Sequence, residues 1–260
     1  MQFGLVVFPN VQQLDLTGPY EVFASWPQAR VRLVAKTLEP VTSSTGLVLK
    51  PDASFDDCPQ LDVLCVPGGG GVNALMADEA TIAFVRQQAE GARFVTSVCT
   101  GALVLGAAGL LKGKGATTHW ASHHLLETLG AIPVQARVVR DGNLMTGGGV
   151  TAGIDFALAL IAEVAGRQVA EAIELSLEYA PRRLSTPAAR RPRRRWWRRR
   201  CASAWRRSSK NVAGSPRPRR ADSGSAVEGM RLGYESSRQF FAPQTAMRDE
   251  ATGPAGVCAI

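Results

Sequence analysis

The sequence lacks the features that mark membrane-spanning and exported proteins. No apolar run approaches the roughly 18 residues that a membrane-spanning helix needs. No basic stretch precedes the apolar segment from Phe3 to Phe8, so the N-terminus does not resemble a secretory signal. We therefore expect a protein of the reducing cytoplasm that has no membrane partner.

Cysteine and histidine patterns of disulfide-rich or zinc proteins are also missing. The cysteines are odd in number and form neither a C-x-x-C pair nor a metal-ligand spacing; they are Cys58, Cys65, Cys99, Cys201 and Cys258. His119 and His123 stand four residues apart, but no acidic third ligand follows at a useful spacing. We expect no disulfide framework, no bound metal and no cofactor.

Acidic residues are scarce at one end of the chain only. The formal net charge is +8, yet residues 1–180 hold 11 Lys and Arg against 17 Asp and Glu, whereas residues 181–260 hold 19 against 5. The body is therefore mildly acidic, as in an ordinary soluble enzyme, and only the tail could attract a polyanion. We predict one catalytic domain over residues 1–180 and a basic low-complexity tail over residues 181–260.

Within the body, short β-rich runs alternate with longer helical patterns, which is typical of a parallel sheet between helices. Expected strands are Gly4 to Phe8, Val31 to Ala35, Asp62 to Val66 and Phe94 to Val98, with an antiparallel or edge segment at Thr45 to Leu49 and a hairpin across Val134 to Thr146. Expected helices are Pro19 to Ser25, Asp78 to Gly91, Thr100 to Leu111, Trp120 to Leu129 and Ala152 to Ala165. We predict an α/β fold with a doubly wound, mostly parallel sheet, a flavodoxin-like sandwich that ends near Tyr179.

Cys99 stands where the reactive groups of such sheets gather. It follows the expected strand that ends at Val98 and precedes a helix rich in small residues, so the chain turns as in a nucleophile elbow. Because a helix N-terminus carries a positive dipole end, we expect the Cys99 thiol to ionise more readily than usual. Cys58 and Cys65 are expected to be buried apolar residues instead.

Five short motifs occur in order along residues 1 to about 180. They are Phe8-Pro9, Leu14 to Phe23, Val66 to Gly69, Ser97 to Gly101 and Thr117 to Trp120. Together they resemble the ThiJ/PfpI superfamily, which is related to class I glutamine amidotransferases. Within it, the combination of Asp15, Cys99-Thr100 and His119-Trp120 most resembles the isonitrile hydratases.

The resemblance implies catalytic roles for Cys99, Asp15 and Thr100. Asp15, in the loop after the first strand, matches the acidic residue that meets the cysteine, where a raised pKa would let it hold and donate a proton. Asp15 could instead cap a helix that starts near Pro19. The proteases of the superfamily have a histidine directly after the cysteine, whereas this chain has Thr100, which disfavours proteolysis.

The resemblance also implies a substrate-binding role for Gly69, Gly70 and His119. The two glycines are expected opposite the cysteine as backbone donors to an anion, although a plain turn after the strand explains them equally well. The run Gly68 to Gly71 lacks the Lys-Ser/Thr of a P-loop, so we expect no nucleotide site. For His119 we expect an orienting or structural role, and the run Gly147 to Gly149 either lines the same pocket or forms a hairpin exit.

The activity implied is addition of water to a small-molecule isonitrile through a thioimidate on Cys99, in a homodimer with its site near the interface. One alternative is a ligand-sensing domain related to AraC-type transcription regulators. The tail shows no pair of helix-turn-helix motifs that such a regulator needs, so a nucleic-acid partner is not expected. The other alternative is a redox or glyoxal-detoxifying relative that uses the same cysteine.

The basic tail invites a different explanation. The segment from Arg191 to Arg200 would ordinarily suggest binding to nucleic acid or membrane. Translation of GC-rich codons shifted by one base from Arg182 onward can instead give a string that resembles the usual end of isonitrile hydratases. We interpret residues beyond about Pro181 as a frame-shifted product, expected to be disordered and without function; a genuine basic arm is the alternative.

Overall fold

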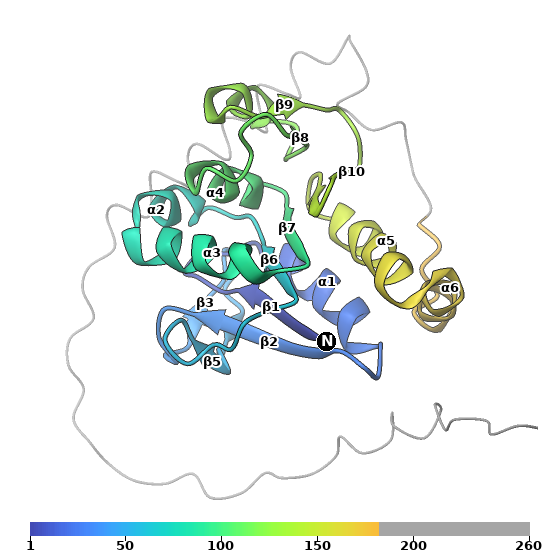
Figure 1. Ribbon diagram of the computed structural model, residues 1–260. Helices are drawn as coiled ribbons and strands as arrows, with labels where there is room; N and C mark the ends of the chain where they lie inside the picture. Colours follow the sequence, from blue (N-terminus) through green and yellow to red (C-terminus); the bar gives the residue numbers. More distant parts are fainter. Residues whose placement is uncertain (182–260) are drawn as a thin grey trace, which may run out of the picture. The chain divides into compact units, whose positions relative to one another are not determined.

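The computed structural model describes residues 1–181, and the structural statements below concern this part of the chain (Figure 1). The predictions about the tail, namely its frame-shifted origin, its disorder and its lack of function, fall on residues 182–260 and lie outside the described residues. Within the described part, no helix is both long enough and apolar enough to cross a membrane.

A seven-stranded sheet forms the centre of the described part, in the order β10-β11-β7-β6-β1-β2-β5. Its strands are β1 (Gln2–Val6), β2 (Arg30–Ala35), β5 (Ala53–Ser54), β6 (Val63–Val66), β7 (Phe94–Val98), β10 (Val138–Asp141) and β11 (Leu144–Gly147). All neighbouring strands are parallel except β10 and β11, which form an antiparallel hairpin at one edge. The predicted doubly wound, mostly parallel α/β fold is confirmed.

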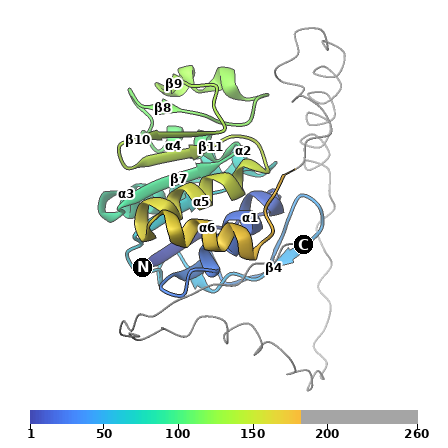
Figure 2. The ribbon, with the colours of Figure 1, turned by 90° about the vertical axis from the view of Figure 1, so that its right-hand side faces the viewer.

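Helices cover both faces of this sheet (Figures 1 and 2). On one face lie α2 (Val72–Ala77), α3 (Glu79–Gly91) and α4 (Gly101–Ala107); on the other lie α1 (Gln13–Ala24), α5 (Ala152–Ala165) and α6 (Arg167–Ser176). Successive residues of β6 alternate between the two apolar cores, because side chains along a strand point to opposite faces. A strand buried on both sides reads as a continuous apolar run, which is why β6 and β7 were predictable.

Several helix ends follow local signals in the sequence. The backbone N–H of Thr81 donates to the side chain of Asp78 at 3.1 Å, so Asp78 caps α3 at the predicted place. Helix α5 has the predicted bounds, Ala152 to Ala165. The predicted helix from Thr100 ends early, at Ala107. Helix α6 was not predicted; it follows Gly166, whose φ of 94° separates it from α5.

Three predicted elements differ from the structure. The first helix begins at Gln13 rather than near Pro19, and Pro19 lies inside it, so the Gly-Pro pair is no helix start here. The segment from Trp120 forms two 3₁₀ turns, η1 (His123–Leu125) and η2 (Glu127–Leu129), in place of an α-helix. The segment expected as antiparallel or edge over Thr45 to Leu49 is antiparallel but shorter: β4 (Val48–Leu49) pairs with β3 (Val41–Thr42) outside the main sheet. A further two-stranded unit pairs β8 (Gly115–Ala116) with β9 (Ile132–Pro133).

Candidate active site

Cys99 lies in a strained turn at the carboxyl end of β7. Its φ of 55° is in the left-handed region, which is uncommon for residues other than glycine and clusters at functional sites. Its N–H donates to the carbonyls of Gly147 at 3.0 Å and Gly148 at 2.8 Å, and its carbonyl accepts from Thr118 Oγ1 at 2.7 Å. These bonds hold the unusual backbone conformation, and the predicted sharp turn from strand to helix at Cys99 is present.

Two glycines let the chain segments around the elbow approach closely. A Cβ at Gly101 would collide with the carbonyl oxygen of Val66, so α4 can start immediately after the elbow only with glycine there. A Cβ at Gly68 would lie 2.6 Å from Thr100 N and 2.8 Å from Asp15 Oδ2. Because Gly68 has no side chain, Asp15 and Thr100 can both approach the space that a Cβ at this position would occupy.

Asp15 is fully buried in the first turn of α1, and it is neither in a loop nor the cap of a later helix. Its Oδ2 accepts the N–H of Gly68 at 3.1 Å. Its Oδ1 is buried and makes no hydrogen bond of ordinary geometry within the described residues. Burial raises the pKa of Asp15 to about 7, against the smaller opposing effects of the Cys99 side chain and the Gly68 N–H. Near neutral pH this carboxyl group can both hold and release a proton.

The Cys99 thiol does not ionise readily, so that prediction is wrong. Burial and the neighbouring charge of Asp15 raise the pKa of Cys99 far above its usual value, while the backbone N–H groups of Thr100 and Val150 act in the opposite sense. The helix that follows has only two turns, and its dipole does not outweigh the loss of water around the sulfur. At neutral pH the Cys99 thiol therefore keeps its proton, and the neighbouring Asp15 carboxyl is protonated in part.

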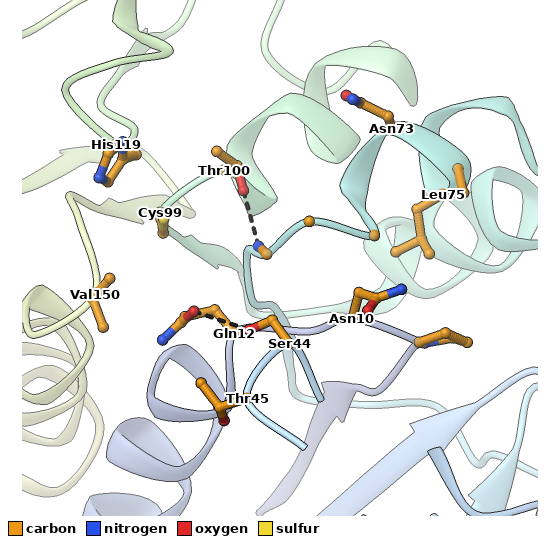
Figure 3. A pocket seen from close by; sticks show the side chains of 15 residues that line it. Asn10, Gln12, Ser44, Thr45, Asn73, Leu75, Cys99, Thr100, His119 and Val150 are labelled. Carbon is orange, nitrogen blue, oxygen red and sulfur yellow. Dashed lines mark hydrogen bonds between the residues drawn. The ribbon is translucent and has the colours of Figure 1, made fainter. Parts of the chain in front are cut away.

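The two glycines expected as a donor pair have different partners. The N–H of Gly69 donates to Thr100 Oγ1 at 3.0 Å (Figure 3), and Gly69 adopts a φ of 140°. The N–H of Gly70 makes no hydrogen bond within the described residues, and Gly70 is exposed in the cavity wall. Gly70 is therefore the one of the two whose N–H is available to a bound molecule, while Gly69 fixes Thr100.

His119 lies beside Cys99 at the cavity wall (Figure 3). Its Nδ1 accepts the N–H of Ala121 at 3.3 Å, so a neutral ring carries its proton on Nε2. Partial burial lowers the pKa of His119, which keeps the ring neutral at pH 7. A Cβ at Gly149 would lie 2.9 Å from His119 Cδ2, so the ring packs against the glycine run after β11.

A cavity of about 650 Å³ opens above Cys99, Thr100 and His119. Its remaining wall comes from the turn after β1, the β3–β4 hairpin, residues 69–71, α2 and the turn after β11 (Figure 3); labelled residues there include Asn10, Gln12, Ser44, Thr45, Asn73, Leu75 and Val150. The sequence reasoning missed these residues, although Asn10, at φ 62° directly after the Phe8-Pro9 motif, offered one signal.

The other cysteines of the described part are away from the cavity. Cys65 is buried in the middle of β6, where burial raises its pKa to about 12, as expected for a core thiol. Cys58 is only half-buried, so the prediction that it is a core residue is wrong. Among residues 1–181 no group of three or more His, Cys, Asp or Glu side chains could hold a metal ion.

Known proteins provide three informative comparisons. The model of the DJ-1/PfpI family matches residues 2–163. An isonitrile hydratase of Pseudomonas putida is 68% identical over 181 residues, which are 70% of this chain and 79% of that protein. The crystal structure of a ThiJ/PfpI family protein from Pseudomonas syringae superposes with a TM-score of 0.75 at 41% identity, over 82% of this chain and 90% of that one.

A match to a regulator is more limited. The HTH-type transcriptional regulator GbdR of Pseudomonas aeruginosa is 36% identical over 137 residues, which are 51% of this chain and only 36% of the regulator.

Proposed function

The chain belongs to the DJ-1/PfpI family, and we propose that within it this protein is an isonitrile hydratase, an enzyme that converts R–N≡C and water into an N-substituted formamide. The observation that carries the proposal is the buried pair of Cys99 and Asp15 at the base of a cavity, in a chain 68% identical to the Pseudomonas putida hydratase. The enzyme is a carbon-nitrogen lyase with a cysteine nucleophile.

The first half-reaction forms a thioimidate. The Cys99 sulfur attacks the terminal carbon of the isonitrile, and the thiol proton passes through Asp15 to that same carbon. The product is S–CH=N–R, in which one C–S bond and one C–H bond have formed. An Asp15 pKa of about 7 suits this relay, because the group exchanges protons most effectively near the working pH.

The second half-reaction releases formamide. Asp15 takes a proton from water as the oxygen adds to the thioimidate carbon, and it delivers that proton to the nitrogen. The tetrahedral adduct collapses, the C–S bond breaks, and the hydroxyl proton returns through Asp15 to the sulfur. The thiol is regenerated and the net reaction is addition of one water.

The neighbouring residues position the reacting atoms. The N–H groups of Thr100 and Val150 stabilise negative charge on the sulfur. Thr100 Oγ1 accepts from Gly69 and so has its own hydrogen available for the substrate nitrogen. The N–H of Gly70 makes no hydrogen bond with any residue of 1–181 and can stabilise developing charge, while neutral His119 orients the substrate as a wall of the cavity.

We place this enzyme in the cytoplasm as a homodimer. The free thiols of the described part, Cys58, Cys65 and Cys99, are consistent with a reducing compartment. The dimer follows from the family resemblance, and light scattering at micromolar concentration tests it: a monomer would contradict it.

The function is tested by incubating the purified full chain with cyclohexyl and aryl isonitriles and measuring formamide. We expect turnover by the native protein, none by Cys99→Ala, and near-native turnover by Cys65→Ala, the matched control for a buried thiol. Absence of formamide from native protein with reduced Cys99 would overturn the proposal. The sensing role suggested by the regulator match, or a redox or glyoxal-detoxifying role, would then take its place.

A further inference from the structure

Three side chains form a cluster beside the turn at residues 148–151, which contacts Cys99. Arg137 precedes β10, Asp155 lies in the first turn of α5, and Tyr179 follows α6. Arg137 Nε donates to Asp155 Oδ2 at 2.6 Å, a terminal guanidinium nitrogen contacts the same oxygen, and the Tyr179 hydroxyl donates to it at 2.9 Å. The cluster therefore joins three elements that are distant in sequence.

Arg137 also contacts both ends of the turn at residues 148–151. Its terminal nitrogen donates to the carbonyl of Thr151 at 2.9 Å and to Thr151 Oγ1 at 3.2 Å, and its own carbonyl accepts the N–H of Gly148 at 2.8 Å. The carbonyl of Gly148 in turn accepts the N–H of Cys99 at 2.8 Å. Only one residue, Gly148, thus links the backbone of Arg137 to the backbone of the cysteine.

Between these two anchored ends lies Val150, whose N–H interacts with the Cys99 sulfur and which Figure 3 shows at the cavity wall near that side chain. The position of this N–H depends on the turn, because Val150 lies between Gly148 and Thr151, which Arg137 contacts. A displaced turn would leave the sulfur with only the N–H of Thr100 and so disfavour the thiolate.

A second ion pair of the same hairpin, between Arg140 and Glu163, provides a comparison for the pair of Arg137 and Asp155. Arg140 pairs with Glu163 at 2.6 Å, with side chains 46% and 42% exposed, against 39% and 31% for Arg137 and Asp155. Pairs with this exposure add little to stability. The difference is that Arg140 makes no contact with residues 148–151, whereas Arg137 holds that turn at both ends.

We propose that Arg137, oriented by Asp155 and Tyr179, is a positioning residue for Cys99 that keeps the Gly148 carbonyl at the cysteine N–H and the Val150 N–H at the sulfur. The proposal rests on Cys99 being the nucleophile of the proposed function. Its consequence is that a contact on the outer surface of the protein determines how reactive the buried thiol is.

The experiment measures the alkylation rate of Cys99 by iodoacetamide against pH in the full chain, with peptide mass spectrometry to separate Cys99 from the other thiols. In Arg137→Gln we expect the profile to move to higher pH and the rate at pH 8 to fall about tenfold, as for loss of a hydrogen bond to a charged group. With isonitrile, kcat falls by a similar factor and KM changes little. Arg137→Lys, which keeps the charge, recovers part of the loss, and the matched control Arg140→Gln keeps the native profile.

An unchanged alkylation profile in folded Arg137→Gln, or an equal shift in Arg140→Gln, overturns the proposal. Should Arg137→Gln not fold, Tyr179→Phe decides, because it removes a single hydroxyl: we expect a shift in the same direction of about twofold, and no shift contradicts the positioning role. Shifted alkylation in a protein that hydrates no isonitrile supports the positioning role and removes only the proposed function.

Discussion

The middle of β6 and the end of β7 each hold a buried cysteine, yet only one of them is equipped for chemistry. Cys65 lies in β6 and Cys99 directly after the neighbouring strand β7; both are almost inaccessible to water, and burial raises the pKa of both thiols. Cys65 has regular strand geometry and packs in an apolar core. Cys99 has a left-handed backbone, a cavity above it, and Asp15 as a proton partner. Reactivity here arises from the surroundings of the thiol and from strain, since burial is common to both.

The carboxyl partner is the sharpest difference between the two thiols, so its removal has the largest expected effect. Asp15→Asn keeps the shape and can still accept the Gly68 N–H, but it carries no proton to or from the sulfur. We expect formamide production to fall about a thousandfold with the fold retained. Asp62→Asn is the control, because Asp62 also accepts a backbone N–H, from Gln2 at 2.7 Å, far from the cavity. Equal activities of the two variants would remove Asp15 from the mechanism.

The same carboxyl group makes stability depend on pH. The pKa of Asp15 is about 7 in the folded protein, above the 3.8 of a free carboxyl, so the folded state keeps a proton that the unfolded state has lost. The contribution of Asp15 to stability is therefore greatest below about pH 4, is lost as pH rises through 7, and is absent well above that. Between pH 5 and pH 8 we expect a loss of about 3 kcal/mol in the native protein that is absent from Asp15→Asn. Urea unfolding of both at the two pH values measures it, and parallel pH dependences would contradict a raised pKa.

The space left by the missing side chain of Gly68, next to Asp15 and Thr100, can be filled by substitution. In Gly68→Ala the new Cβ would meet Asp15 Oδ2 and Thr100 N, so these groups must separate. We expect turnover to fall about ten- to a hundredfold, as for a small misplacement of reacting groups. Gly115→Ala is the control, because its Cβ has no neighbour closer than 3.6 Å. Steady-state formamide assays compare the two, and native turnover in Gly68→Ala would show that this spacing is not critical.

The smallest expected effect concerns the backbone of the two cysteines. At position 99 the left-handed conformation favours glycine, so Cys99→Gly should be more stable than Cys99→Ala by about 1 kcal/mol. In the strand at position 65 the order should reverse, with alanine better than glycine by about 0.5 to 1 kcal/mol. Urea unfolding of the four variants decides: the same order at both positions means that Cys99 carries no strain.

Much of the fold was accessible from the sequence because it depends on local patterns. The apolar runs of β6 and β7, the cap at Asp78 and the helix after Thr151 are each specified by residues within a few positions of one another. The segment after Trp120 was predicted wrongly as a helix, because its spacing of apolar residues is helical while Gly130 and the packing of Leu126 into the core favour short 3₁₀ turns.

The sequence by itself determined that the chain forms a parallel α/β sheet and that Cys99 stands between a strand and a helix, since strand, turn and helix follow from residues adjacent in the chain. Only the tertiary structure decided what surrounds that cysteine. Asp15 meets Gly68 across 53 residues, and Arg137 meets Asp155 and Thr151 across a hairpin and a helix start. The pKa values also depend on the tertiary structure. The sequence suggested an easily ionised thiol, but burial by distant segments raised the pKa of both Cys99 and Asp15. Desolvation depends on everything packed around a group and not only on its neighbours in the chain.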